Sequence, residues 1–347
     1  MKILLRNISI LILTHHRAED LRKCLQALTA VRSSFQAQII VVVNACCSET
    51  ENVLEQHPQV HVVQCDDISP AEARNAGLRH ATGEFIVFLD DDACISDGYF
   101  DYAHQALLKY PEAQILGGPD STFPDAGPQE QSIGLALQSP FVTGPTCLRH
   151  GGMRSRGTSR KADERSLILC NLWIRREFFS EKGFLFDGRF WRNEENVLLY
   201  RLRQEVMIYV PQLKVYHRRK KKLTQLFRAN FNSGYYRVKS IFLYPGSFKN
   251  IFSLPSFLLL CTLFLPFMPP AIIAVYLGYW LSSVFFAGWL AFSQKMISLW
   301  PLVFFYQVVI VFSYGWGFLY GTIYCCGKLV SRKLQKTFKL WLGSGLN

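Results

Sequence analysis

From residue 8 to about 117 the chain alternates between short apolar, β-branched runs and longer stretches with the period of an amphipathic helix. Strands separated by helices in this way predict an α/β fold with a doubly wound, mostly parallel sheet. In such a sheet ligands bind at the carboxyl ends of the strands, so functional residues are expected just after each strand. The predicted strands are 8–13, 39–43, 60–63, 85–89 and 114–117, and the predicted helices are 19–29, 49–55, 70–80 and 98–108.

Beyond residue 117 the pattern breaks off and then resumes. Residues 118–166 are rich in Gly, Pro, Ser and Arg, and 151–157 are expected to be the most flexible part of a long loop. A loop of this length inside a compact domain is usually functional or disordered. The α/β pattern returns with a strand at 167–173, a helix near 194–204 and a strand at 207–210.

Three apolar segments follow, at 251–268, 271–292 and 299–324. Each approaches or exceeds the roughly 20 residues that a helix needs to cross a bilayer, and Trp and Tyr recur near the segment ends, as at membrane interfaces. The alternative is the buried helical core of a soluble protein. Because Lys295 is the single charge between the segments, we favour a helical membrane region.

The charge distribution divides the chain at the same place. The formal net charge is +12, yet all 26 acidic residues lie at or before Glu205. The basic residues after Glu205 stand beside apolar segments, which favours anionic lipid as their partner and disfavours nucleic acid. None of the ten cysteines forms a Cys-x-x-Cys pair, which is typical of reduced thiols facing a cytosol.

Basic residues on both flanks of the apolar region predict that both flanks are cytoplasmic. Three crossings cannot satisfy that expectation, so we predict that 251–268 is re-entrant or lies in the interface. Aromatic and basic residues interleave over 223–250, which suits an amphipathic segment on anionic lipid, although plain anchoring explains the basic residues equally well. The predicted domains are 1–222 (cytosolic), 223–250 (interfacial), 251–325 (membrane) and 326–347 (a basic cytoplasmic tail).

The most specific chemical signal is the apolar strand 85–89 followed by Asp90, Asp91 and Asp92. Carboxylates at a strand end suit Mg²⁺ or Mn²⁺, which take hard oxygen ligands and often share them with a diphosphate. The alternative is a solvated acidic turn that caps the following helix. A second signal is the pair Glu194 and Glu195 at the start of a helix, where carboxylates also favour the helix dipole without any function.

Six motifs, in order, make residues 8–217 resemble a family 2 glycosyltransferase, an inverting nucleotide-sugar enzyme with the A-type fold. They cover about 60% of the chain, and their order and spacing make the resemblance specific. The motifs are 39–44 (Ile-Ile-Val-Val-Val-Asn), 73–77 (Ala-Arg-Asn-Ala-Gly), 89–92 (Leu-Asp-Asp-Asp), 170–177 (Cys-Asn-Leu-Trp-Ile-Arg-Arg-Glu), 186–190 with Glu194-Glu195, and 209–218.

The resemblance implies a role for each matching residue. Asp90 and Asp92 would hold a divalent metal and the donor diphosphate, and Asp91 would line the sugar pocket. Glu195 takes the place of the catalytic base, with Glu194 supporting it or touching the acceptor. The remaining expectations are Thr14 and Asn44 at the nucleoside, Arg74 at the nucleotide or donor, Asn171 at a sugar, and His217 at the metal or diphosphate, unless His217 belongs to a basic surface patch.

Three departures from the family's pattern matter. Asn44 replaces an Asp, so a uridine nucleotide cannot be assumed, and the base is Glu195 in place of the usual Asp. The stretch 225–229 lacks the Trp of processive synthases, which favours single sugar addition.

The sequence therefore predicts a metal-dependent enzyme using Mn²⁺ or Mg²⁺ with a nucleotide-sugar donor. The expected acceptor is a lipid-linked saccharide or glycolipid, approached from the side of the 118–166 loop, for cell-surface polysaccharide synthesis. The expected location is the cytoplasmic face of a bacterial inner membrane. Two alternatives are a polyprenyl-phosphate sugar synthase and a non-catalytic membrane scaffold with the same fold.

Overall fold

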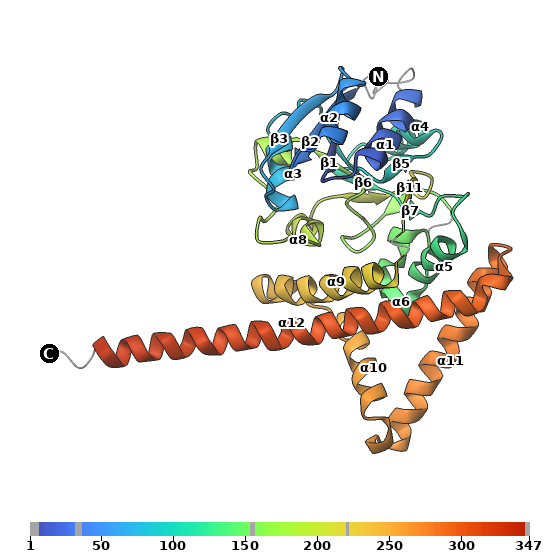
Figure 1. The fold of residues 1–347 in the computed structure, drawn as a ribbon, viewed down its shortest axis with the longest axis vertical. Coiled ribbons are helices and arrows are strands. Elements are labelled where there is room, and N and C mark those ends of the chain that lie inside the picture. Colours follow the sequence, from blue (N-terminus) through green and yellow to red (C-terminus); the bar gives the residue numbers. More distant parts are fainter. Residues whose placement is uncertain (1–6, 32–36, 153–156, 220–221, 344–347) are drawn as a thin grey trace. The chain divides into compact units, whose positions relative to one another are not determined.

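The structure is a computed structural model that describes residues 7–31, 37–152, 157–219 and 222–343, with backbone only from 329 onward. Parts of the predictions lie outside the described residues: 1–6, 32–36 and 220–221 of the predicted domain 1–222, the flexible stretch at 153–156, and 344–347 of the tail. The chain forms two compact units, the first made of Met1–Lys220 with Ser283–Gln307 and the second of Lys221–Ser282 with Val308–Asn347. Figure 1 shows the elements along the chain.

An eight-stranded sheet forms the centre of the first unit, in the order β3-β2-β1-β4-β9-β6-β10-β8. The first four strands are mutually parallel, β9 runs antiparallel between β4 and β6, and β10 is parallel to β6. This confirms the predicted mostly parallel sheet. The strands are β1 (Ile8–Thr14), β2 (Ala37–Asn44), β3 (His61–Cys65), β4 (Phe85–Asp90), β6 (Ile115–Gly117), β8 (Arg160–Lys161), β9 (Asn171–Arg175) and β10 (Met207–Tyr209).

Helices cover both faces of this sheet, because alternate strand residues point to opposite sides. Ile10 and Val41 pack in a core with α1, α2 and α4, whereas Leu11 and Val42 pack in a second core with α3, α7 and α8. The two cores make a three-layer unit. The helices are α1 (Ala18–Val31), α2 (Ser48–Glu55), α3 (Pro70–Leu78), α4 (Tyr99–Lys109), α7 (Glu177–Ser180) and α8 (Glu194–Arg201).

A smaller three-stranded sheet has the order β5-β11-β7, and its strand β5 follows β4 closely in the sequence. Its strands are β5 (Ala93–Ile95), β7 (Asp120–Ser121) and β11 (Val215–His217). Antiparallel pairing of β5 with β11 places His217 opposite Ala93, the residue after Asp92.

The prediction of a continuous loop over 118–166 was wrong in part. The described residues of this stretch include β7, β8, α5 (Pro128–Leu137), α6 (Pro140–Thr143) and the 3-10 helix η2 (Gly144–His150). Ile133, Leu135 and Ala136 of α5 are buried. The many Gly and Pro residues hid this helix, because two of the prolines stand at helix starts, where proline is tolerated. The predicted strand at 167–173 also moved, since β9 begins only at Asn171.

After residue 222 the structure is helical: α9 (Leu223–Leu243), α10 (Leu254–Leu263), α11 (Pro270–Ser293) and α12 (Trp300–Gly343). Among the described residues two helical stretches, Pro270–Ser293 and Ile297–Lys328, are long and apolar enough to cross a membrane. The ten-residue α10 is too short at about 1.5 Å per residue. Only 11% of the apolar stretch of α11 is buried, which disfavours a soluble core helix.

Small residues bring α9 and α12 together in the second unit. A Cβ atom added at Gly317 of α12 would lie 1.8 Å from the carbonyl oxygen of Phe231, and one added at Gly234 of α9 would lie 2.2 Å from that of Tyr314. No side chain fits at either position, so the two backbones are in direct contact. Small residues allow the same close approach between membrane helices.

Candidate active site

The carboxylates after β4 are held by residues at the end of the neighbouring parallel strand β1. The hydroxyl of Thr14 donates a hydrogen bond to Asp91 Oδ2 at 2.9 Å. The guanidinium of Arg17, three residues on, lies 3.1 Å from Asp91 Oδ1 and 2.6 Å from Asp92 Oδ2. Asp91 and Asp92 are buried, whereas the side chain of Asp90 is 32% exposed. Asp91 and Asp92 are therefore buried and paired with Thr14 and Arg17, which argues against a solvated acidic turn.

Burial raises the pKa of Asp91 to about 6, although the charge of Arg17 and the hydrogen bond from Thr14 oppose that rise. Burial lowers the pKa of Arg17, but the nearby aspartates outweigh it and the net change is upward. Arg17 thus stays charged beside the cluster.

His217 reaches the same cluster from β11. Its Nε2 lies 2.9 Å from Asp92 Oδ1 and 3.8 Å from Asp90 Oδ2. Burial lowers the pKa of His217. The charge of Asp92 and the hydrogen bond with Asp92 raise the pKa by more than burial lowers it, so the net change is upward. The structure thus brings His217 to the acidic strand end, as its predicted role requires.

Arg74 of α3 connects the aspartates to the second acidic pair. Its guanidinium lies 3.2 Å from Asp90 Oδ1 and also pairs with Glu194 Oε1. The helix that carries Arg74 begins with a capping box between Ser69 and Glu72. Burial raises the pKa of Glu194, and Arg74 opposes that rise. The two carboxylate groups, about 100 residues apart in sequence, therefore meet at one arginine.

Glu195 has a different set of partners. The side-chain amide of Asn196 donates to Glu195 Oε1 at 3.0 Å, and Arg149 Nη1 lies 3.6 Å from the same oxygen. Arg149 also donates to the carbonyls of Glu164 and Arg165, both at 2.9 Å. Glu195 is thus oriented by Asn196 of α8 and by Arg149 of η2, and the segment after β8 holds Arg149 in place.

Two predicted ligand contacts lie inside the protein instead. Asn44 exchanges two hydrogen bonds with the backbone of Ile68, at 2.8 and 3.0 Å. Asn171 is 0% exposed, and its amide donates to the carbonyls of Pro119 and Leu213. In this structure both side chains position neighbouring backbone, so they are not free to contact a nucleoside or a sugar.

A buried chain of hydrogen bonds extends from Asn171. Tyr99 donates from its hydroxyl to Asn171 Oδ1 at 2.6 Å, and Trp173 Nε1 donates to the Tyr99 hydroxyl at 2.9 Å. Trp173 is 0% exposed. This chain fixes the start of β9 against α4.

Left-handed backbone marks the same edge of the sheet. His16, Ala45 and Asp67 follow β1, β2 and β3, and each has a positive φ, as does Asn193 before α8. Non-glycine residues rarely adopt this conformation, which costs free energy and often marks functional sites.

A buried ion cluster lies just past His217. Arg219 Nη1 lies 2.9 Å from Asp120 Oδ2, and His150 Nδ1 lies 2.6 Å from Asp120 Oδ1. Burial raises the pKa of Asp120, but the charge of Arg219 and the contacts with Arg219 and His150 outweigh it and hold the pKa well below its usual range. The cluster ties β7 and η2 to the chain that leaves β11.

The chemistry of the cluster fits a divalent metal. Atoms of Asp90, Cys170 and His217 that can bind a metal all lie within 4.8 Å of one another. Both oxygens of Asp92 already have partners, Arg17 and His217. Carboxylate oxygens suit Mn²⁺ and Mg²⁺, and imidazole suits several transition metals.

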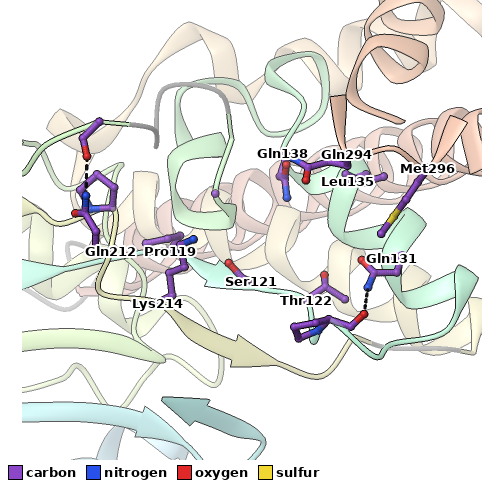
Figure 2. A pocket seen from close by; sticks show the side chains of 14 residues that line it. Pro119, Ser121, Thr122, Gln131, Leu135, Gln138, Gln212, Lys214, Gln294 and Met296 are labelled. Atoms are coloured by element: carbon purple, nitrogen blue, oxygen red, sulfur yellow. Dashed lines mark hydrogen bonds between the residues drawn. The ribbon is translucent and has the colours of Figure 1, made fainter. Parts of the chain in front are cut away.

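A cavity of about 590 Å³ lies elsewhere in the first unit. Its described lining combines uncharged polar side chains with Pro, Gly, Leu and Met residues, Lys214 is its charged member, and Figure 2 shows these side chains. Two of the glutamines donate hydrogen bonds to backbone carbonyls, Gln131 to Phe123 and Gln212 to Gly157. The polar lining residues are Ser121, Thr122, Gln131, Gln138, Gln212, Lys214 and Gln294.

Sequence reasoning assigned no role to Arg17, Arg149 or Cys170. Arg17 stands three residues after Thr14, so its position just after a predicted strand could have marked it as a site residue. Arg149 and Cys170 reach the site through long-range packing, and although Cys170 begins the motif 170–177, nothing in that motif marks it as a ligand.

Comparison with known proteins gives three kinds of match. The model of Glycosyl transferase family 2 matches residues 9–184. The uncharacterized glycosyltransferase YibD of Escherichia coli is 26% identical over 153 residues, which cover 42% of this chain and 43% of that protein. An uncharacterized glycosyltransferase of Haemophilus influenzae is 28% identical over 115 residues, which cover 32% of this chain and 38% of that protein. The match thus spans less than half the length of either relative.

Among solved structures, the mannosyltransferase PcManGT from Pyrobaculum calidifontis in complex with GDP-Man and Mn²⁺ is similar, with a TM-score of 0.53. It is 16% identical, and the alignment covers 91% of this chain and 88% of that one. At this identity the likeness is one of fold.

Proposed function

The chain belongs to glycosyl transferase family 2, and on that premise we propose that it transfers one sugar, with inversion, from a nucleotide-sugar to a membrane-associated saccharide or glycolipid. The observation that carries the proposal is the convergence of two acidic groups on Arg74 at the carboxyl edge of the sheet. Inverting transfer needs one group that neutralises the leaving diphosphate and another that deprotonates the acceptor.

The diphosphate side of this reaction is assigned to the end of β4. Asp90 and His217 would hold Mn²⁺ or Mg²⁺, with Asp92 orienting His217 through the 2.9 Å contact. When bound, the ion supplies positive charge that stabilises the leaving nucleoside diphosphate. Arg17 supplies further positive charge beside Asp91 and Asp92. The mannosyltransferase of similar fold, solved with GDP-Man and Mn²⁺, supports this assignment.

The acceptor side is assigned to α8. Glu195 would accept the proton of the attacking hydroxyl, and its position beside Arg149 and Asn196 keeps its carboxylate oriented. Glu194 is paired with Arg74, so its role would be to position Arg74 and Asp90. Attack on the face opposite the leaving group would give a β-linkage from an α-configured donor.

The cavity in Figure 2 is a candidate for the neutral saccharide of the acceptor. Amide and hydroxyl side chains both donate and accept hydrogen bonds, which suits sugar hydroxyls. Its volume of about 590 Å³ is within the usual range of roughly 300–1,000 Å³ for ligand pockets.

A membrane location is proposed from the helices after residue 222. Two of them reach membrane-spanning length, and the stretch after Glu205 contains no acidic residue. An even number of crossings would leave both basic flanks on one side, which fits a catalytic domain at the cytoplasmic face of a bacterial inner membrane. A nearby bilayer favours a lipid-linked acceptor.

The variant Glu195→Gln tests the hydroxyl-acceptor mechanism. Because general base catalysis contributes about 10²- to 10⁴-fold, we expect kcat to fall by about that factor while the donor Kd stays within a few-fold. Glu55→Gln, an exposed change on α2, is the matched control. The assay reads nucleoside diphosphate released from a panel of nucleotide-sugars, with and without Mn²⁺.

The other outcomes identify the alternatives. Activity of Glu195→Gln within a few-fold of the parent would reject the hydroxyl acceptor and favour a polyprenyl-phosphate sugar synthase, whose acceptor is already ionised. If the parent protein neither binds nucleoside diphosphate with Mn²⁺ nor hydrolyses any donor, the non-catalytic scaffold becomes the better account.

A further inference from the structure

The pairing of β4 with β9 places a cysteine beside the metal cluster. In this antiparallel ladder Phe88 lies opposite Leu172 and Leu89 lies opposite Asn171. One further step in the same register brings Asp90 opposite Cys170. Opposed residues in antiparallel strands lie about 4.5–5.5 Å apart at Cα, so side chains on one face are in reach of each other.

Side-chain positions agree with this register. The Cys170 sulfur, an Asp90 oxygen and a ring nitrogen of His217 all lie within 4.8 Å of one another. Ligand atoms on one zinc ion, at about 2.0–2.3 Å from it, are separated by roughly 3.5 Å. Small side-chain rotations would therefore bring these three atoms around one ion.

The remaining aspartates near the cluster have other partners. Asp92 pairs with Arg17 and with His217, and Asp91 pairs with Arg17 and Thr14. Nδ1 of His217 is buried and has no hydrogen-bond partner within the described part of the chain. The sulfur of Cys24 lies 3.8 Å from the backbone carbonyl oxygen of Asp90, so Cys24 contacts the main chain of Asp90. The Cys170 sulfur is the atom grouped with Asp90 and His217 at metal-binding distance.

We propose that Cys170 is a metal ligand, so that Asp90, Cys170 and His217 bind a divalent ion of borderline or soft character, such as Co²⁺, Zn²⁺ or Cd²⁺. Thiolate ligands favour such ions strongly over Mg²⁺, which prefers oxygen. The site thus has a metal preference different from an all-oxygen site, and zinc competes with Mn²⁺ for it. This inference rests on the metal site of the proposed function.

The test adds Co²⁺ alone to the reduced full-length protein in detergent. We expect one equivalent to bind and to give a near-ultraviolet sulfur-to-cobalt charge-transfer band. In Cys170→Ala the band disappears and the Co²⁺ affinity falls at least about 10-fold, since even indirect partners of metal ligands are worth about 10- to 100-fold. Cys147→Ala, which removes another buried thiol of the same unit, keeps the band.

A second measurement is independent of the spectrum. One equivalent of Zn²⁺ should raise the thermal midpoint of the parent protein, Cys170→Ala should lose most of that rise, and Cys147→Ala should keep it. If Cys170→Ala does not fold, Cys170→Ser replaces it, because a serine hydroxyl gives no such band. The thermal midpoint of each variant reports folding.

Three results overturn the proposal: no Co²⁺ binding, binding without the band, or a band that persists in the Cys170 variants. None of these measurements needs a nucleotide-sugar. Sulfur ligation can therefore fail while glycosyl transfer is observed, and the proposed transfer can fail while the band appears.

Discussion

The guanidinium of Arg74 contacts Asp90 and Glu194 at the same time. Its side chain is 8% exposed and that of Glu194 is 6% exposed, so both charges are largely removed from water. A buried charge without its partner is costly. Arg74 therefore contributes to stability as well as to the arrangement of the site.

Arg74→Met should lower the free energy of unfolding by about 3–5 kcal/mol, because it leaves Glu194 buried without its partner. Arg74→Lys keeps the charge but not the two-pronged guanidinium, so a smaller loss is expected. Urea unfolding of the detergent-solubilised protein measures both. Arg79→Met, an exposed change after the same helix, should stay within about 0.5 kcal/mol. An Arg74→Met variant as stable as the parent would contradict the assignment.

At the residue scale, the sequence was informative where local pattern and chemistry coincide. Asp90 to Asp92 follow a continuous apolar strand, and Glu194 and Glu195 begin a helix, so both groups were predicted as candidates from sequence alone. Cys170 was not, because its place opposite Asp90 depends on the register of β4 and β9. That register is set by packing of the whole strand.

The ion cluster of Asp120, Arg219 and His150 connects separate secondary-structure elements. It joins β7 and η2 to the residues after β11, which carries His217. Because the pKa of Asp120 is held down in the folded state, its ionised form stabilises the fold above its ordinary unfolded pKa, near 4. This contribution is lost as the pH falls below that value.

Acid unfolding tests the cluster. Below about pH 4 the parent should lose up to about 1.4 kcal/mol of stability per pH unit through Asp120, and Asp120→Asn should lack this part of the slope. At pH 7 the variant should be less stable by about 3–5 kcal/mol, since Arg219 loses its buried partner. Asp125→Asn, at an exposed position, is the control. Equal acid slopes in parent and Asp120→Asn would refute the argument.

The contact of α9 with α12 leaves no room at Gly317. Gly317→Leu should separate the two helices and lower the thermal midpoint in detergent by several degrees, because backbone would have to shift. Gly327→Leu is a matched control in the same helix, where an added Cβ meets nothing within 4 Å. Differential scanning fluorimetry measures both, and equal midpoints would contradict the packing.

At the element scale, periodicity located most strands and helices of the first 117 residues to within a few positions, but it missed the short strand β5. It failed over 118–166, where Gly and Pro concealed α5. The last apolar segment ends at residue 324, but the helix that contains it, α12, continues to Gly343. A change from apolar to basic residues alters which surroundings suit a helix but does not end it, since Lys and Arg are good helix formers.

For the whole molecule, the main contrast is in the carboxylates. All Asp and Glu residues lie at or before Glu205, and the helices α9 to α12 contain none. The helices from α9 to α12 expose large apolar side chains, among them Phe267 at 84% and Val275 at 70%. Exposed apolar surface of this extent requires a nonaqueous partner. We infer that the partner is lipid.

Membrane fractionation checks this inference. The full chain should sediment with membranes, remain there in 1 M salt, where ionic contacts are screened to about 3 Å, and enter solution with detergent. A chain released by salt alone would be held by its basic residues only. A chain that is soluble without either treatment would contradict the membrane assignment.

Trp173 gives this protein an internal optical reporter. Its indole is fully buried, hydrogen-bonded to Tyr99 and three positions from Cys170 on the same strand end. Paramagnetic ions quench nearby indole emission, whereas Mg²⁺ and Zn²⁺ do not quench in this way. The chain has seven tryptophans, so comparison of the parent with Trp173→Phe isolates the emission of this indole. Its lifetime would then separate occupancy by Co²⁺ or Mn²⁺ from occupancy by diamagnetic ions, without label or substrate.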